Sequence, residues 1–346
     1  MVRIDADAHI DETEATWEYL EDSERHYIPT TIENGHRTDQ GWQFPGVVLR
    51  RPIRDYRRTG ATAATSQLLD IDERLRHLDR LGIDTQVIFP TVFIRSRFAG
   101  HADLELALTR TYNRWIADRT SKSNGRLRWA AVLPLLSMDK AVEELRWAKD
   151  HGACGIFKKG VECEGRNAGD EYFFPLYEEA NKLDVPICVH TGSDGVGYGL
   201  SPSALDAVVA FQPIVNAGLP EKFPHLRVAI IEAGAAWVPV VLSNDAGAKR
   251  RGFHQASGQR QMLDVDKDLL RRSRIFVTCQ SHDDIPYILQ FGTEDNLMIG
   301  TDYTHADQSA EMLAFEILEQ RCAAGDFSAE VLHKIVEDNP RRFYGF

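Results

Sequence analysis

Residues Val185–His190 read VPICVH, a short run of apolar and β-branched residues that ends in a histidine. Apolarity that is continuous rather than alternating indicates a strand buried on both faces, as in a parallel sheet. Seven more runs of this kind occur, several of them directly after the Gly, Asn or Pro that ends a helix. In chain order, the eight runs are Arg3–His9, Asp84–Pro90, Trp129–Leu135, Ala153–Lys159, Val185–His190, Leu226–Glu232, Arg274–Cys279 and Asn296–Asp302.

Segments of helical period lie between these runs. They are Ser66–Leu81, His101–Ser123, Met138–Asp150, Tyr172–Leu183, Ser203–Ala217, Ala235–Ala246, Asp283–Phe291 and Ala310–Ala324, with a terminal helix at Ser328–Asp338. Eight strand-then-helix units predict an α/β fold of the (β/α)₈ TIM-barrel type. The alternative is a doubly wound open sheet, but no G-x-G-x-x-G motif follows the first run.

A long segment interrupts the pattern between the first run and its helix. Residues 11–65 carry several prolines and glycines and no strong period. Loops of this length in compact domains are usually functional. We expect a single barrel domain over residues 1–346, in which the insertion at residues 11–65 forms a loop-rich lid over the catalytic face.

Composition narrows the class of protein. The 346 residues are 43% hydrophobic and 27% charged, as in soluble globular proteins. The net charge of −12 and the absence of a basic run argue against nucleic acid or an anionic membrane as partner. No signal-like or membrane-spanning stretch is present, which favours a cytoplasmic location. Five dispersed cysteines without a C-x-x-C pair argue against disulfides and a cysteine zinc site.

Polar residues end several of the apolar runs. In a barrel the reactive side chains lie at the carboxyl ends of the strands. The first run ends with Asp7 and His9 on one side of the strand, and the fifth, sixth and eighth runs end in His190, Glu232 and Asp302. A single such residue is often a helix cap or a structural hydrogen-bonding group. Their joint occurrence predicts a metal site with nitrogen and oxygen ligands, which suits Zn²⁺, Mn²⁺ or Fe²⁺.

Four stretches carry a resemblance to a known family. DADAHIDE, VPICVHTGSDG, FPHLRVAIIEAGAAWVP and NLMIGTDYTHAD resemble the amidohydrolase superfamily, in the branch that includes aminocarboxymuconate-semialdehyde decarboxylase and the aromatic-acid decarboxylases. The resemblance implies one divalent ion held by Asp7, His9, His190 and Asp302, with zinc as the expected metal and manganese or iron as alternatives. It also implies a small-molecule substrate and a homodimer. A second ion bridged through Lys158 or Lys159, which end the fourth run, is the alternative.

The chain departs from the family's pattern at Glu232, where decarboxylases of this branch carry a histidine. An ionised Glu232 would repel a substrate carboxylate by about 4 kcal/mol at 4 Å with an effective dielectric of 20. We therefore expect hydrolysis of a small cyclic or aromatic amide, lactam or lactone by metal-activated water, with Asp302 as proton acceptor and Glu232 and His305 flanking the substrate. Decarboxylation of an aromatic or cyclic carboxylic acid at the same site is the alternative. A non-catalytic binding barrel is a third hypothesis.

Four further residues are candidates for substrate binding. Arg95 and Arg97 follow the second run and could clamp a substrate carboxylate, or lie in surface salt bridges instead. Trp42 in the insertion and Trp237 after the sixth run could form walls around an aromatic substrate. Burial in the core is the commoner use of such residues.

Overall fold

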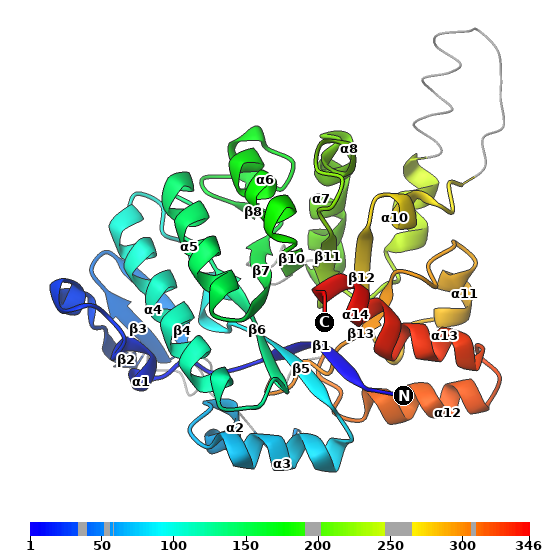
Figure 1. The fold of residues 1–346 in the computed structure, drawn as a ribbon, viewed down its shortest axis with the longest axis horizontal. Helices are drawn as coiled ribbons and strands as arrows, with labels where there is room; N and C mark the ends of the chain where they lie inside the picture. The colour runs from blue at the N-terminus through cyan, green and yellow to red at the C-terminus, as the bar shows by residue number, and fades with distance from the viewer. Residues whose placement is uncertain (34–39, 52–55, 58, 191–201, 246–264, 306–308) are drawn as a thin grey trace, which may run out of the picture.

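Eight parallel strands surround the centre of the molecule in this computed structural model (Figure 1), which describes the whole chain except residues 34–39, 52–55, 58, 191–201, 246–264 and 306–308. Their order in the sheet is β1-β5-β6-β7-β10-β11-β12-β13. The predicted (β/α)₈ barrel is confirmed. The strands are β1 (Ile4–His9), β5 (Thr85–Phe89), β6 (Leu127–Val132), β7 (Ala153–Lys159), β10 (Ile187–His190), β11 (Val228–Ile231), β12 (Ile275–Cys279) and β13 (Leu297–Ile299).

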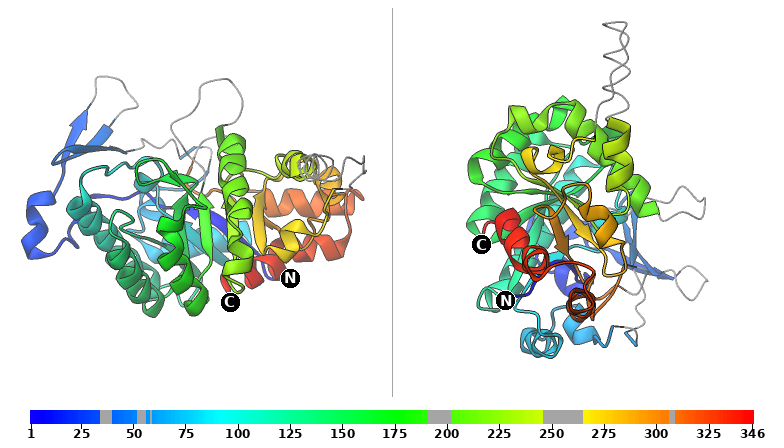
Figure 2. Two further views of the ribbon diagram at one scale, coloured as in Figure 1. Left: turned by 90° about the horizontal axis from the view of Figure 1, so that it is seen from above. Right: turned by 90° about the vertical axis from the view of Figure 1, so that its right-hand side faces the viewer.

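Helices cover the outside of this sheet (Figures 1 and 2). The main ones are α3 (Ile71–Leu81), α4 (Ala102–Ser121), α5 (Met138–Asp150), α6 (Phe174–Leu183), α7 (Pro202–Asn216), a helix at residues 238–245, α11 (Ile285–Leu289) and α12 (Ala314–Ala323). The chain ends with α13 (Ala329–His333), a π-helical turn η4 (Lys334–Asp338) and α14 (Asn339–Tyr344). Among the helices that the structure describes, none is long and apolar enough to cross a membrane.

The first predicted helix, Ser66–Leu81, starts only at Ile71, and a separate short helix precedes it. The short helix α2 (Ala63–Ser66) ends before Leu68, whose φ of 48° lies in the left-handed region. Helix α3 then starts anew, because the Asp70 side chain accepts a hydrogen bond from the Glu73 backbone N–H at 2.8 Å and caps it. Periodicity alone did not separate the two helices, since the apolar spacing continues across the break.

Part of the insertion is a small antiparallel sheet that the sequence did not predict (Figure 2). Strands β2 (Thr30–Glu33), β3 (Gln40–Phe44) and β4 (Val47–Arg51) pair in that order. Trp17, at the end of α1 (Glu14–Trp17), packs edge-on against Trp42 and Phe44, with ring centres 5.9 and 5.3 Å away. These buried rings belong to the same hydrophobic cluster as the barrel core, so the insertion packs onto the body of the domain. Residues 34–39, 52–55 and 58 of the predicted lid lie outside the described residues.

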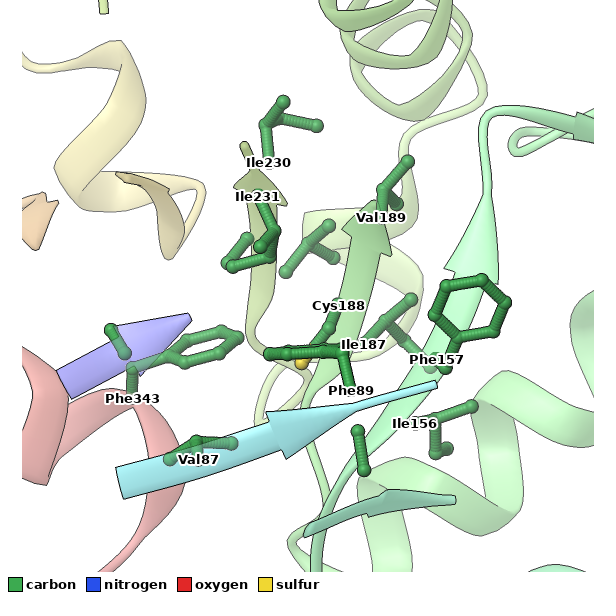
Figure 3. Close-up of a cluster of buried hydrophobic side chains, with 14 of the residues drawn as sticks. Val87, Phe89, Ile156, Phe157, Ile187, Cys188, Val189, Ile230, Ile231 and Phe343 are labelled. Carbon is green, nitrogen blue, oxygen red and sulfur yellow. The ribbon is translucent and has the colours of Figure 1, made fainter. Parts of the chain in front are cut away.

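Apolar side chains from neighbouring strands fill the barrel. Figure 3 shows Phe89 of β5, Phe157 of β7 and residues 187–189 of β10 in this cluster, with Phe343 of α14 beside β1. The Tyr344 hydroxyl donates a hydrogen bond to the Ala6 carbonyl at 2.7 Å. The C-terminal helix is therefore anchored to the first strand.

The barrel closes where the first strand meets the segment after the last. The Asp302 backbone N–H donates to the Asp7 carbonyl, and the His9 N–H donates to the Tyr303 carbonyl, both at 2.9 Å. These two bonds bring the chain's first and last strand ends together. Residues nearly 300 positions apart thus become neighbours at the mouth of the barrel.

The buried carboxylate of Asp5 stabilises this closure through hydrogen bonds. Asp5 accepts hydrogen bonds from the Thr301 N–H (2.8 Å), the Thr301 hydroxyl (2.5 Å) and the Gln86 amide (2.7 Å). The Arg74 guanidinium donates in turn to the Gln86 carbonyl oxygen. Burial raises the pKa of Asp5 to about 6, although these hydrogen bonds oppose the rise. The network joins β1, β5, α3 and the end of β13.

Replacing Thr301 by Val should destabilise the fold. The substitution keeps the shape of the side chain but removes one hydrogen bond to a fully buried carboxylate, so we expect a loss of about 1–3 kcal/mol in the free energy of unfolding. Thr301→Ser is the control, since it keeps the hydroxyl and loses only a methyl group. Urea titration at pH 7.5 measures both. A Thr301→Val protein as stable as the parent would show that the Asp5 network does not hold the closure.

Candidate metal and substrate site

The tautomer of His9 determines whether its Nε2 has a lone pair that can bind a metal ion. Its Nδ1 lies 3.0 Å from the carbonyl oxygen of Pro90, at the end of β5. A carbonyl can only accept a hydrogen bond, so Nδ1 carries the proton in the neutral ring. The lone pair on Nε2 then points to the mouth of the barrel. This is the arrangement found in metal-binding histidines.

The four residues implied as ligands lie together around this nitrogen. The His9 Nε2 is 3.1 Å from the His190 Nε2, 3.5 Å from the Asp7 Oδ1 and 3.5 Å from the Asp302 Oδ1. The His190 Nε2 is also 3.7 Å from the Asp7 Oδ1. All four side chains are buried. Because the carboxyl ends of the strands meet at one edge of the barrel, polar residues that are far apart in the sequence lie together here.

Glu232 and His305 complete the cluster from two other directions. The Glu232 Oε2 is 3.3 Å from the His190 Nε2, and the His305 Nδ1 is 2.7 Å from the Asp302 Oδ1. The His305 ring stacks on the His9 ring, with centres 3.8 Å apart. The three residues predicted to act in catalysis thus adjoin the predicted ligands.

Two residues at the site were missed by sequence reasoning. The Ser309 Oγ lies 2.9 Å from the Glu232 Oε1 and 2.8 Å from the Asp302 Oδ2, between the two carboxylates. The Thr91 Oγ1 lies 3.2 Å from the His305 Nε2. Both residues follow strand ends, but nothing in their sequence context distinguishes them from ordinary loop hydroxyls. Residues 191–195 and 306–307, which belong to the recognised motifs, lie outside the described residues.

The backbone is strained at both carboxylates that follow strands β11 and β13. Glu232 has a φ of 60° and Asp302 a φ of 51°, in the left-handed region that non-glycine residues seldom adopt. The Glu232 N–H donates to the Thr278 hydroxyl at 2.8 Å, which holds this conformation from β12. Strain of this kind costs about 1–3 kcal/mol per residue and concentrates at functional sites. Here it turns both carboxylates towards His190 and His9.

The donor set of the cluster suits a divalent cation. Burial raises the pKa of Asp7, but the positive charge that His190 and His9 carry when protonated lowers it below its ordinary value, so the carboxylate is charged. The Asp7 Oδ1 is buried and has no hydrogen-bond donor among the residues that the structure describes. The possible ligand atoms form two overlapping groups that share His9, one with Asp7 and His190 and the other with Glu232, Asp302 and His305. A Zn²⁺, Mn²⁺ or Fe²⁺ ion would neutralise the lone pairs that crowd this space.

The ammonium groups of the two lysines at the end of β7 have partners outside this cluster. The Lys158 Nζ lies 3.2 Å from the Glu162 Oε1 and 3.6 Å from the centre of the Phe173 ring. The Lys159 Nζ donates to the Ser96 carbonyl at 2.6 Å. Neither ammonium is placed to bridge two ions, so the alternative of a lysine-bridged second ion finds no support in these contacts.

A cavity of about 570 Å³ adjoins the cluster at His190. Its walls come from the 3₁₀ helix η2 (Val92–Arg95) and the residues after it, the ends of β6 and β7, and the turn between β8 (Val161–Glu162) and β9 (Arg166–Asn167). Arg95 and Arg97 both line it and are exposed. Their predicted role in substrate binding therefore has a suitable location and stays a prediction.

The two tryptophans lie elsewhere. Trp42 is buried against Trp17, where the insertion joins the main hydrophobic core. Trp237 is buried against Phe211, and its Nε1 donates to the Gly234 carbonyl at 2.8 Å. Neither is among the described residues that line the cavity. The commoner use of such rings, packing in a core, explains their positions.

Comparison with known proteins identifies the relatives of this chain. A sequence model of the family described as Amidohydrolase matches residues 4–346. The chain is 22% identical over 291 residues to 2-amino-3-carboxymuconate-6-semialdehyde decarboxylase of Dictyostelium discoideum, an alignment that covers 81% of this chain and 78% of that protein. It is 29% identical over 188 residues to gamma-resorcylate decarboxylase of Rhizobium sp. (strain MTP-10005), covering 49% of this chain and 57% of the relative.

Solved structures show the same fold. An amidohydrolase from Mycobacterium avium subsp. paratuberculosis K-10 superimposes with a TM-score of 0.77 at 18% identity, covering 100% of this chain and 98% of that one. The 5-carboxyvanillate decarboxylase from Novosphingobium aromaticivorans DSM 12444, solved with manganese and 4-hydroxy-3-methoxy-5-nitrobenzoic acid, gives a TM-score of 0.70 at 17% identity and covers 100% and 96% of the two chains.

We expect the purified protein to retain about one divalent ion per chain after loading with Mn²⁺ or Zn²⁺ and dialysis. Replacing His190 or Asp7 by Ala removes one of four ligands and should reduce this content severalfold. His151→Ala is the control, because that histidine is exposed and stacks on Trp147, outside the cluster. Elemental analysis measures the ratio. Two tightly held ions, or a ratio unaffected by both ligand variants, would contradict the single-ion site.

Proposed function

The chain belongs to the amidohydrolase family, and we propose that it is a metal-dependent, non-oxidative decarboxylase of an aromatic or cyclic carboxylic acid. The observation that carries this proposal is a cluster of possible metal ligands beside a cavity with aromatic and aliphatic walls. Its ligand atoms form two overlapping groups that share His9, one with Asp7 and His190 and the other with Glu232, Asp302 and His305. Both curated relatives described above are decarboxylases by name. This support favours the alternative derived from the sequence over hydrolysis, which was the first expectation.

Repulsion between an ionised Glu232 and a substrate carboxylate was the argument against decarboxylation. The contact of Ser309 with two carboxylates weakens that argument. A serine hydroxyl has one proton, yet its oxygen lies within hydrogen-bond distance of both Glu232 and Asp302. It can donate to one and accept from the other only if that other carboxyl group is protonated. Two carboxylates this close also favour sharing a proton over carrying two negative charges. We infer that Glu232 and Asp302 hold one proton between them through Ser309, with Glu232 as its site when substrate is bound.

A protonated Glu232 would have two effects on the reaction. It would not repel the substrate's carboxylate, and it would supply the proton that decarboxylation requires. The carbon that carries the carboxylate accepts this proton from Glu232, the bond to the carboxyl carbon then breaks, and CO₂ leaves with the ring restored. Glu232 is left as a carboxylate and regains its proton from solvent.

The metal would be held by Asp7, His9, His190 and Asp302, and when bound it would supply positive charge that orients the substrate's carboxylate and stabilises negative charge on the ring. His305 has a positioning role in this scheme. Its Nδ1 contacts the Asp302 Oδ1 and its Nε2 contacts the Thr91 hydroxyl, so the ring is held from both sides. This arrangement orients Asp302 towards the cluster.

The insertion is the proposed lid of the site. Strand β4 contacts η2, the segment that carries Arg95. Residues 46–48 also share a second cavity, of about 460 Å³, with Arg95 and Arg97. Closure of this segment over the substrate would exclude water, as lids in other enzymes do.

A direct assay distinguishes the two reactions. We expect the Mn²⁺-loaded protein to release CO₂ from at least one member of a panel of hydroxybenzoates, and to leave cyclic amides and lactones intact. Glu232→Gln removes the proton donor, so kcat should fall by about 10²–10⁴ while metal content stays unchanged. Asp326→Asn is the control for a carboxyl-to-amide change, because Asp326 is exposed and pairs with Arg321 on the surface.

Two results would contradict this proposal. One is ring opening of an amide or lactone without CO₂ release from any acid. The other is CO₂ release that is unaffected by Glu232→Gln, which would leave decarboxylation intact but exclude Glu232 as the proton donor.

A further inference from the structure

Glu12 is a buried carboxyl group near the cluster that takes no part in the proposed reaction. It belongs to the stretch DADAHIDE, three positions after His9, and its side chain is almost fully buried. Burial raises the pKa of Glu12 to about 8, although the backbone N–H groups that donate to it oppose the rise. Because burying a carboxyl group is costly, its partners indicate what this position does for the protein.

Both oxygens of Glu12 accept hydrogen bonds from the backbone just after β5. The Thr91 N–H donates to the Glu12 Oε1 at 3.1 Å, and the Val92 N–H donates to the Oε2 at 3.0 Å. Val92 is the first residue of η2, and the first N–H groups of a helix have no acceptor within that helix. The Glu12 side chain therefore ties the segment after β5 to the segment after β1.

The segment that Glu12 holds contacts two histidines of the cluster. The Pro90 carbonyl accepts the hydrogen bond from the His9 Nδ1 at 3.0 Å, and the Thr91 Oγ1 lies 3.2 Å from the His305 Nε2. The two imidazole rings stack on each other, with centres 3.8 Å apart. One short stretch of backbone thus supports both rings of the stack.

We propose that Glu12 is a positioning residue for metal binding: by holding Thr91 and Val92, it keeps the Pro90 carbonyl on His9 and the Thr91 hydroxyl on His305. The inference rests on the metal site of the proposed function and adds a residue that is not itself a ligand. A displaced Pro90 carbonyl would no longer fix the tautomer and orientation of the His9 ring, and a metal-binding histidine depends on that support.

Mn²⁺ affinity tests this role without turnover. Electron paramagnetic resonance of free Mn²⁺ gives the Kd of the full-length protein. Glu12→Gln keeps the size of the side chain and one acceptor oxygen, but it places an amide NH₂ against the other backbone N–H. We expect its Kd to rise about tenfold, within the range for outer partners of metal-binding histidines. Glu12→Ala removes both acceptors and should raise the Kd further; if it does not fold, Glu12→Gln is the test.

Glu144→Gln is the matched control. Glu144 is also a buried glutamate, and it accepts hydrogen bonds from the Asn113 amide at 2.9 Å and the Arg114 guanidinium at 2.6 Å, between α4 and α5. This substitution should lower the free energy of unfolding, measured by urea titration, and leave the Mn²⁺ affinity unchanged. The comparison separates an effect on the His9 side chain from a general loss of stability.

The His9 Nδ1 proton gives a second measurement, on the metal-free protein. A ring N–H that donates to a buried carbonyl exchanges slowly with water and can be observed by NMR after ¹⁵N labelling of histidine. Its absence from His9→Ala identifies the signal. We expect the signal in the parent protein and in Glu144→Gln, and its broadening or loss in Glu12→Gln.

Each result either supports or overturns the role of Glu12. A Mn²⁺ affinity or a His9 signal that is unchanged in Glu12→Gln would overturn it, as would an equal loss of affinity in Glu144→Gln or a parent protein without Mn²⁺ binding or without the signal. If Glu12→Gln weakens Mn²⁺ binding as expected but no acid releases CO₂, the positioning role stands and the proposed reaction is wrong. If CO₂ is released but Mn²⁺ affinity does not depend on Glu12, the reaction stands and the positioning role is wrong.

Discussion

The closure of the barrel between its first and last strand ends is the constraint on which the rest of this structure depends. Two backbone hydrogen bonds make it, from Asp302 to Asp7 and from His9 to Tyr303. The same residues carry the side chains of the cluster, so the bonds that close the fold also set the distances within the site. Asp5, buried two positions before Asp7, ties this closure to β5 and to the end of β13. Stability and function therefore share one set of contacts.

The site combines two energetically unfavourable features, crowded lone pairs and strained backbone conformations. Lone pairs from His9, Asp7 and Asp302 point at one another across about 3.5 Å, and Glu232 and Asp302 adopt left-handed backbone conformations. Folding tolerates such crowding and strain where the surroundings leave no alternative, here the register of the strands and the hydrogen bond from Glu232 to Thr278. A cation at the centre would convert mutual repulsion into coordination.

Glu232 shows the limit of treating a charge in isolation. As a lone ionised carboxylate it would oppose an anionic substrate, and this argument led from the sequence to hydrolysis. In the folded protein it lies one serine hydroxyl away from Asp302, and the hydrogen-bonding requirement of Ser309 favours a proton on the pair. In the proposed reaction the same residue then supplies a proton to carbon. Its protonation depends on a neighbour 77 positions away, which no local motif reveals.

The sequence by itself determined the class of fold and the residues of the cluster. Eight apolar runs predict eight buried strands, and a parallel barrel brings their carboxyl ends to one face, so polar residues such as His190 that end these runs must meet. It could not show that Trp42 packs into the main hydrophobic core, that Lys159 faces a cavity, or that Ser309 bridges two carboxylates. Those positions depend on loop conformations and side-chain directions. Contacts between distant segments determine both, and the spacing of residue types along the sequence does not encode them.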